Sequence, residues 1–229
     1  MKTIGLIGGV SWVSTADYYS YINKGINNQL GGLNFAQCII HSFNYADIVK
    51  NNEGENWNAT LSMVTQAALN LQKSGAEAIV LCANTMHMIA DELVKNIQIP
   101  VIHIATATAT EISKQGLNKV GLLGTRFTME RDFFKAKLKE QGITTLLPDD
   151  EERIFIHDTI GNELGKGIIN PETKDYYLRV IKKLVDNGAQ GIILGCTEIP
   201  MLIKTGDIDI PLFDTTLIHS NAAVGFMLS

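Results

Sequence analysis

The fold is decided by residues 188–199, Gly188-Ala189-Gln190-Gly191-Ile192-Ile193-Leu194-Gly195-Cys196-Thr197-Glu198-Ile199, an apolar run that ends in a thiol, a hydroxyl and a carboxylate. The run does not alternate with polar residues, which is typical of a parallel strand covered on both faces. In open α/β sheets, ligands gather beyond the carboxyl ends of the strands. The sequence therefore predicts that Cys196 lies at a functional site.

A near-copy of this stretch occurs earlier in the chain, as Gly75-Ala76-Glu77-Ala78-Ile79-Val80-Leu81-Cys82-Ala83-Asn84-Thr85. Both copies run from glycine and alanine through an aliphatic strand to a polar turn. When they are aligned without gaps, Gly75 corresponds to Gly188 and Ala83 corresponds to Cys196. The thiol of the later copy is thus replaced by a methyl group in the earlier one.

Further segments repeat in the same order, because residues 3–9 resemble residues 119–125 and residues 99–103 resemble residues 210–214. The repetition predicts an α/β fold of two pseudo-symmetric domains, each with a mostly parallel sheet flanked by helices. We expect residues 1–104 plus 210–229 to form the first domain and residues 105–209 to form the second. The active site is expected in the interdomain cleft, where the two polar turns approach one ligand from opposite sides.

Local patterns predict the remaining elements. Ser14 followed by Asp17 resembles a capping box at the start of the first helix, and the polar segment 51–56 is expected to be a loop. Apolar spacing predicts helices at residues 57–74, 86–95, 106–115, 129–140, 152–164 and 171–187, and strands at 36–41, 78–81, 99–102 and 144–147.

Composition excludes several classes of function. The chain has 229 residues and a net charge of −5, with its Lys and Arg residues scattered, so neither a nucleic acid nor a membrane is an expected partner. No apolar segment is long enough to span a membrane or suits a signal peptide, which favours a cytoplasmic location. Three cysteines without CxxC spacing argue against disulfides or structural zinc, and the five histidines show no metal-ligand spacing.

The strand ends carry the candidate site residues. Cys196 lies near backbone N–H groups that favour a thiolate, so it is a candidate base or nucleophile; Cys38 and Cys82 lie within strands and are interpreted as structural. Neutral hydrogen-bonding groups that could hold a carboxylate ligand follow successive strands, at Asn84, Thr85, Thr125 and Thr197. Ser11 in the first glycine loop is a further binding candidate. That loop lacks the GxGxxG spacing of a dinucleotide site.

Taken together, these residues resemble the aspartate/glutamate racemase family over essentially the whole chain. The motifs that carry the resemblance are residues 5–12 (GLIGGVSW), 83–87 (ANTMH), 122–125 (LLGT) and 195–198 (GCTE). Residues 12 and 85–87 are similar to a bacterial branch that is broad in specificity or directed to L-aspartate and L-glutamate.

The resemblance implies racemisation of an amino acid without pyridoxal phosphate or another cofactor, by a two-base mechanism. One thiolate removes the α-proton while a thiol on the opposite face returns a proton. It further implies that Cys196 is one acid/base and that Asn84, Thr85, Thr125 and Thr197 hold the α-carboxylate and amino group. A homodimer is expected from the same resemblance.

The sequence departs from the family pattern at two places. The family has cysteine or threonine directly before the Asn-Thr pair, whereas this chain has Ala83, so the position of the second acid/base is chemically empty. The arginine and lysine that some archaeal members place near the substrate align with Ile48 and Gly165. The chain is therefore expected to be a natural one-cysteine variant or an impaired racemase, and the partner of the substrate's side-chain carboxylate is unassigned.

Two alternative functions follow from the same residues. A single cysteine suits a decarboxylase of the arylmalonate type, which belongs to a related family. A non-catalytic amino-acid-binding module would keep the polar turns and lack the chemistry.

Overall fold

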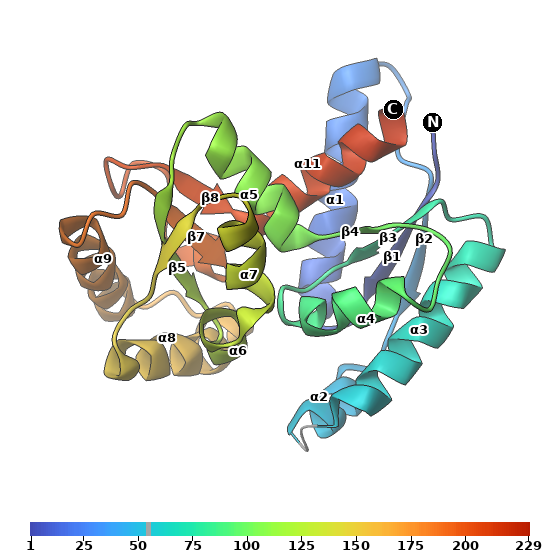
Figure 1. Ribbon diagram of the computed structural model, residues 1–229. Helices are drawn as coiled ribbons and strands as arrows, with labels where there is room; N and C mark the ends of the chain where they lie inside the picture. Colours follow the sequence, from blue (N-terminus) through green and yellow to red (C-terminus); the bar gives the residue numbers. More distant parts are fainter. Residues whose placement is uncertain (54–55) are drawn as a thin grey trace. The chain divides into compact units, whose positions relative to one another are not determined.

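Two compact units make up the chain in the computed structural model, which describes residues 1–53 and 56–229 (Figure 1). The first unit consists of Met1–His103 and His219–Ser229, and the second unit consists of Ile104–Ile218. The sequence predicts that residues 210–229 belong to the first domain. That boundary is too early, because Leu212–Asp214 pairs with a strand of the second sheet.

The first unit is built on a parallel sheet whose strand order, among the described residues, is β2-β1-β3-β4. Its strands are β1 (Ile4–Gly8), β2 (Cys38–Ser42), β3 (Ala78–Leu81) and β4 (Val101–Ile102). Its helices are α1 (Trp12–Leu30), α2 (Tyr45–Glu53), α3 (Trp57–Lys73), the 3-10 helix η1 (Thr85–Ile89), α4 (Ala90–Val94) and most of α11 (Thr215–Leu228).

The second unit repeats this topology, with a parallel sheet in the order β6-β5-β7-β8 among the described residues. Its strands are β5 (Lys119–Gly124), β6 (Thr144–Leu146), β7 (Ile192–Gly195) and β8 (Leu212–Asp214). Its helices are α5 (Ile104–Lys114), α6 (Arg126–Glu130), α7 (Asp132–Glu140), α8 (Asp150–Asn162), η2 (Leu164–Lys166), α9 (Pro171–Asp186) and α10 (Ile199–Leu202). The expected α/β fold with parallel sheets and flanking helices is confirmed.

The repeated sequence forms the same turn in each unit. Gly75 and Gly188 both end a long helix with a positive φ, 98° and 94°, a conformation that glycine adopts without strain. The following N–H of Ala76 donates to the carbonyl of Leu71 at 3.0 Å, and that of Ala189 donates to its equivalent, Leu184, at 2.9 Å. The gap-free alignment of the two stretches therefore corresponds to a structural repeat.

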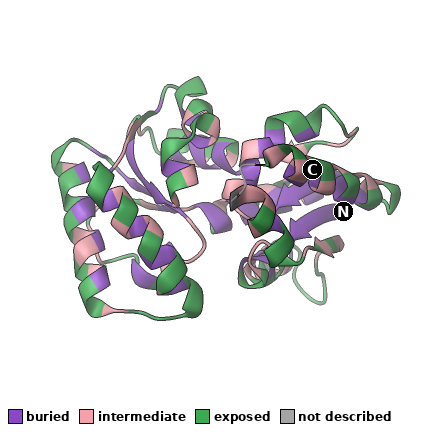
Figure 2. Cartoon of the chain, turned by 90° about the horizontal axis from the view of Figure 1, so that it is seen from below, coloured by how far each residue is buried: buried purple, intermediate pink, exposed green. Residues whose placement is uncertain are grey.

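Both faces of the first sheet are packed, which explains why its strands lack alternation. Ile79 and Leu81 of β3 contribute to a core with α3, whereas Ala78 and Val80 contribute to a second core with α1 and α11. Successive side chains of a strand point to opposite faces, so each core receives every second residue. Figure 2 shows the buried strands of both units in purple.

Some local predictions are wrong at element boundaries. Helix α1 begins at Trp12 without a side-chain cap, so Ser14 lies inside the helix instead of capping it. The loop expected over residues 51–56 is wrong at 51–53, which form the last turn of α2; residues 54–55 lie outside the described part. The helix expected at 129–140 is two helices, separated at Arg131 by extended backbone (φ −78°, ψ 159°).

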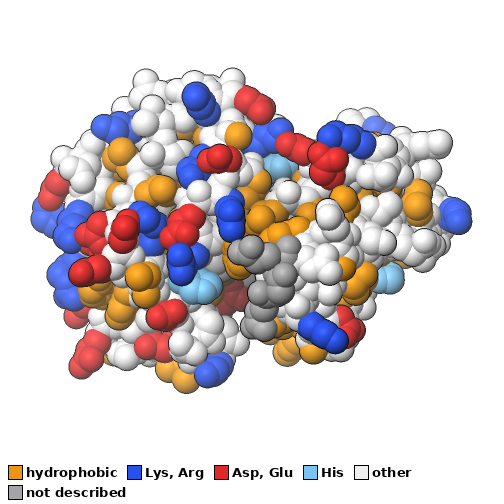
Figure 3. All heavy atoms as spheres, turned by 60° about the horizontal axis from the view of Figure 1, so that its bottom comes forward, with side chains coloured by type: hydrophobic (Ala, Val, Ile, Leu, Met, Phe, Trp, Pro, Cys, Tyr) orange, Lys and Arg blue, Asp and Glu red, His pale blue; other side chains and the backbone are white. Residues whose placement is uncertain are grey.

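The described helices include none that is long and apolar enough to cross a membrane. On the face drawn in Figure 3, acidic and basic side chains intermingle over the second unit. Ion pairs of α8 in this unit join Arg153 to Glu130 at 3.4 Å and Glu152 to Lys183 at 2.5 Å. This pattern agrees with the scattered charge of the sequence.

Candidate active site

One edge of the second sheet collects three of the predicted site residues. Gly124 at the end of β5 is paired with Gly195 at the end of β7, so Thr125 and Cys196 both follow the carboxyl ends of neighbouring strands. Thr197 follows Cys196 directly, and α6 and α10 begin at the same edge. Within this unit, the structure thus brings Thr125, Cys196 and Thr197 to the end of the sheet where ligands of α/β proteins bind.

The thiol of Cys196 is held by a carboxylate. Its Sγ–H donates to Oε2 of Glu198 at 2.8 Å, and the hydroxyl of Thr197 donates to the same oxygen at 2.7 Å. Burial raises the pKa of the Cys196 thiol well above its usual value, and the negative charge of Glu198 raises it further. The sulfur is therefore protonated at neutral pH and lies beside a group that can accept its proton.

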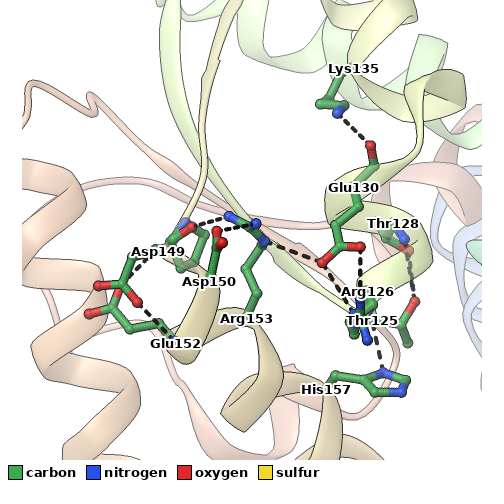
Figure 4. Close-up of polar contacts among 11 residues, drawn as sticks. Thr125, Arg126, Thr128, Glu130, Lys135, Asp149, Asp150, Glu152, Arg153 and His157 are labelled. Atoms are coloured by element: carbon green, nitrogen blue, oxygen red, sulfur yellow. Dashed lines mark hydrogen bonds and ion pairs between the residues drawn. The ribbon is translucent and has the colours of Figure 1, made fainter.

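Thr125 caps α6 and precedes Arg126, which belongs to a charged network (Figure 4). Its Oγ1 accepts a hydrogen bond from the backbone N–H of Thr128 at 3.4 Å. The guanidinium of Arg126 points to Glu130 at 3.2 Å, and Arg153 contacts the same carboxylate at 3.4 Å. Glu130 already pairs with the Arg126 side chain, so we assign no role to Arg126 in binding the side-chain carboxylate of a substrate.

The corresponding edge of the first sheet carries the other predicted residues. Ile7 of β1 is paired with Leu81 of β3, so the loop holding Ser11 and the turn at residues 82–85 follow neighbouring strands. Ala83, Asn84 and Thr85 form that turn, and Asn84 is buried. That both edges serve one substrate stays a prediction from the sequence repeat.

Ser11 has a strained backbone. Its φ of 56° is positive, which no other non-glycine residue among those described shows. Its carbonyl accepts hydrogen bonds from the N–H of Thr15 at 3.4 Å and from the Thr15 hydroxyl at 3.1 Å. Strain of this kind often occurs at binding sites, although the binding role of Ser11 stays a prediction.

The other two cysteines differ from Cys196 in their surroundings. Cys82 is 1% exposed, packs in the core shared by α1 and α11, and follows β3 instead of lying within it. Burial strongly raises the pKa of its thiol. Cys38 is the first residue of β2, and burial raises its pKa as well. Both are consistent with structural residues.

Sequence reasoning missed three contacts at these edges. The sequence did not predict that Glu198 binds the thiol, although a carboxylate two residues after a thiol is a usable signal. Ser14 donates to the carbonyl of Cys82 at 2.5 Å and so ties α1 to the first-unit turn. The His87 side chain contacts the carbonyl of Ala83 at 3.0 Å. In the described part of the chain, no three His, Cys, Asp or Glu side chains group as a metal site.

Comparison with known proteins gives consistent relatives. The family model described as Asp/Glu/Hydantoin racemase matches residues 7–223. The structure of a protein proposed to be an Asp/Glu racemase from Yersinia pestis is 45% identical and covers 100% of both chains, with a TM-score of 0.96. An aspartate racemase homologue from Pyrococcus horikoshii OT3 is 35% identical over 100% of both chains, with a TM-score of 0.89. The broad-specificity amino-acid racemase RacX of Bacillus subtilis is 24% identical, covering 72% of this chain and 71% of RacX.

Proposed function

The chain belongs to the Asp/Glu/hydantoin racemase family, and from this premise we propose that it exchanges the α-proton of aspartate or glutamate, with Cys196 as acid and base and without a cofactor. Relatives of the chain include a broad-specificity amino-acid racemase and an aspartate racemase homologue. The observation that carries the proposal is the hydrogen bond from the Cys196 thiol to Glu198 at the carboxyl end of β7.

The proposed proton transfer uses both members of this pair. Glu198 accepts the thiol proton, and the resulting Cys196 thiolate removes the α-proton of the amino acid. The electron pair of the broken C–H bond stays on the α-carbon and is delocalised into the α-carboxylate. A cationic α-ammonium group near the sulfur would lower the raised pKa of Cys196 and so favour the thiolate. The proton on sulfur then exchanges with solvent, and a solvent-derived proton returns from sulfur to the α-carbon. Glu198 gives its proton back to the sulfur, which completes the exchange.

The neutral polar residues at the strand ends are the proposed substrate contacts. Asn84, Thr85, Thr125 and Thr197 would hold the α-carboxylate and amino group, as the family resemblance implies. Ser11 would contact the substrate from the first glycine loop. Donors placed there stabilise the negative charge that develops as the α-carbon loses its proton. Their positions at the carboxyl ends of β1, β3, β5 and β7 support this assignment.

Ala83 limits the proposed reaction. The sequence repeat aligns it with Cys196, and its methyl group has no proton to give or accept. Cys82 is a poor substitute because it is buried in the core between the sheet, α1 and α11. We therefore propose a one-cysteine racemase, in which exchange of the α-proton with solvent is faster than inversion.

Incubation in D₂O separates these two outcomes. L-aspartate and L-glutamate are followed by NMR for deuterium at the α-carbon and by chiral chromatography for the D-enantiomer. The unaltered chain is expected to incorporate deuterium with little inversion, Cys196→Ser to lose incorporation, and Ala83→Thr or Ala83→Cys to gain inversion.

Other results would point elsewhere. Inversion by the unaltered chain as fast as by Ala83→Cys would show that residue 83 is not a required base. Tight binding of aspartate by calorimetry without deuterium incorporation would indicate a binding module instead of an enzyme.

We also propose that the chain forms a homodimer. Support comes from exposed apolar residues beside the edge strand β2: Leu33 is 92% exposed, Phe35 is 53% exposed and Ile40 is 42% exposed. Exposed apolar groups next to an unpaired strand edge favour association. Light scattering is expected to give twice the mass of the chain, and Leu33→Asp to reduce it to one copy; a monomeric unaltered chain would contradict the proposal.

A further inference from the structure

A buried cluster of aromatic polar residues in the first unit takes no part in the proposed proton transfer. His87 of η1 lies between His103 and His219, with ring centroids at 4.8 and 5.3 Å. The hydroxyl of Tyr18 on α1 lies 2.8 Å from Nδ1 of His219 on α11. His87 is 1% exposed and His219 is fully buried. Four separate segments of the chain meet at this cluster.

Backbone carbonyls determine which ring nitrogens carry hydrogen. A carbonyl only accepts, so Nδ1 of His87, at 3.0 Å from the Ala83 oxygen and 3.3 Å from the Asn84 oxygen, is the donor. Nε2 of His219 lies 2.6 Å from the Ile102 oxygen and is likewise a donor. His219 Nδ1 then accepts from the Tyr18 hydroxyl. Both rings are consistent with neutral imidazoles whose tautomers are set by these partners.

We infer that His87 is a positioning residue of the proposed site, whose Nδ1–H holds the carbonyls of Ala83 and Asn84 and thereby orients Asn84 and Thr85. The inference rests on the proposed function, which gives those two residues their role. A peptide group is planar, so holding a carbonyl also fixes the direction of the following N–H and Cα. His87 therefore controls the turn without touching the substrate.

Packing alone is a weaker explanation of His87. Among the described residues, its buried Nε2 has no partner in hydrogen-bond geometry, although the backbone of Ile102 also interacts with the ring. A buried polar atom without a partner is costly to the folded state, and an apolar side chain of similar size would avoid that cost. What the imidazole supplies, and an apolar side chain does not, is the Nδ1–H that contacts the two carbonyls. Burial lowers the pKa of His87 to about 4, so this donor is neutral at pH 7.

The second repeat lacks an equivalent donor. In the gap-free alignment, His87 corresponds to Pro200, which cannot supply one. There the turn is organised by Glu198, which accepts hydrogen bonds from the side chains of Cys196 and Thr197. The two turns are thus held by opposite means: a side-chain donor to backbone carbonyls in the first unit, and a side-chain acceptor from a thiol and a hydroxyl in the second.

Three substitutions at position 87 separate the donor from the ring. Asparagine places its amide nitrogen on Cγ, as Nδ1 is placed, whereas glutamine places it one atom further out, closer to Nε2. Leucine fills space without a donor. All three remove the ring contacts with His103 and His219. Only His87→Asn keeps a donor where Nδ1 lies, within reach of the Ala83 and Asn84 carbonyls. Urea unfolding establishes that each variant is folded before it is compared.

Two measurements then test the inference. The rate of α-deuterium incorporation into L-aspartate is expected to stay within about threefold for His87→Asn, and kcat to fall about 10- to 100-fold for His87→Gln and His87→Leu, with a smaller change in KM. Amide hydrogen exchange at residues 84–87 is expected to be about tenfold faster in the Gln and Leu variants than in the Asn variant.

The outcomes also distinguish this inference from the proposed function. If the unaltered chain incorporates deuterium and the Asn, Gln and Leu variants behave alike in both measurements, His87 acts by packing and the inference is overturned. If the unaltered chain incorporates none, the proposed function fails, and amide exchange at residues 84–87 alone decides whether His87 holds the turn.

Discussion

Glu198 and Cys196 show how two adjacent side chains set each other's chemistry. The carboxylate raises the pKa of the thiol by its charge, yet it is also the acceptor within 2.8 Å of the thiol proton. These two effects oppose each other during catalysis, because one disfavours the thiolate and the other provides a route to it. Substitution of Glu198 separates them.

We predict that Glu198→Gln lowers the rate of α-deuterium incorporation by about 100-fold, because an amide cannot accept the proton as a base. The same change removes a negative charge, so the pKa of Cys196 falls and its alkylation by iodoacetamide shifts to lower pH. A more reactive thiol with slower exchange is the distinguishing result. Unchanged exchange in Glu198→Gln would show that the carboxylate is not the proton acceptor.

Cys82 and Cys196 provide a matched comparison of two thiols. We predict that Cys82→Ala keeps deuterium incorporation and lowers the free energy of unfolding by about 1 kcal/mol, because removal of the buried sulfur leaves a small cavity. Cys196→Ala is predicted to abolish incorporation. Deuterium incorporation is measured by NMR and stability by urea unfolding for both variants. Loss of deuterium incorporation in Cys82→Ala would show that this thiol takes part in the reaction.

At the scale of elements, the contact between α1 and α11 joins segments from the two ends of the chain. Gly25 of α1 faces Val224 of α11, and a Cβ added at Gly25 would lie 2.7 Å from Cγ2 of Val224. Valine is stiff at χ1 and buried here, so it cannot turn aside. The missing side chain of Gly25 thus sets how closely these helices pack.

We predict opposite effects for two glycine substitutions in these helices. Gly25→Ala is expected to destabilise the protein by about 1–3 kcal/mol through overpacking, despite the better helix propensity of alanine. Gly225→Ala in α11 has nothing within 4 Å of the added Cβ and is expected to stabilise by up to about 1 kcal/mol. Urea unfolding measures both. If Gly25→Ala also stabilises, the helices do not pack as closely as described.

At the scale of the whole molecule, the buried histidines link stability to pH. Burial lowers the pKa of His87 to about 4 and that of His219 to about 3, and His87 also disfavours charge on His219. The side chains that face these rings are Tyr18, His103 and each other. In the unfolded chain both histidines titrate near pH 6.5, so the unfolded state binds more protons in the interval below that value.

Stability is therefore predicted to be greatest above pH 6.5 and to fall as pH decreases towards 4. Each histidine is expected to contribute a loss of about 2 kcal/mol between pH 6.5 and pH 5. Urea unfolding at several pH values measures the slope, and His87→Asn, which does not titrate, is expected to reduce it. An equal slope in the variant would show that His87 is not buried as a neutral ring.

Much of the fold and part of the site follow from local pattern. The aliphatic runs at 78–81 and 192–195 predict buried parallel strands, and the repeated glycines at 75 and 188 predict equivalent turns. Because a residue that follows such a strand must lie at the carboxyl edge of the sheet, the location of Cys196 also follows. The end of helix α2 was predicted to be a loop because residues 51–53 are polar, whereas the structure continues the helix to Glu53 and packs it against α3.

The sequence by itself determined the class of fold, the internal repeat and the position of the thiol, since these depend on neighbouring residues and on which side chains avoid water. Only the tertiary structure decided that β8 pairs with β7, that Glu198 bonds the thiol, and that Tyr18 meets His219 across 201 positions. The pairing of β8 with β7 and the contact of Tyr18 with His219 join segments that lie far apart in the sequence, and their separation carries no periodic signal. The hydrogen bonds of Glu198 with the thiol and of His87 with the two carbonyls join residues only two to four positions apart, but they depend on how each turn folds, which is fixed only when the sheets and helices have packed.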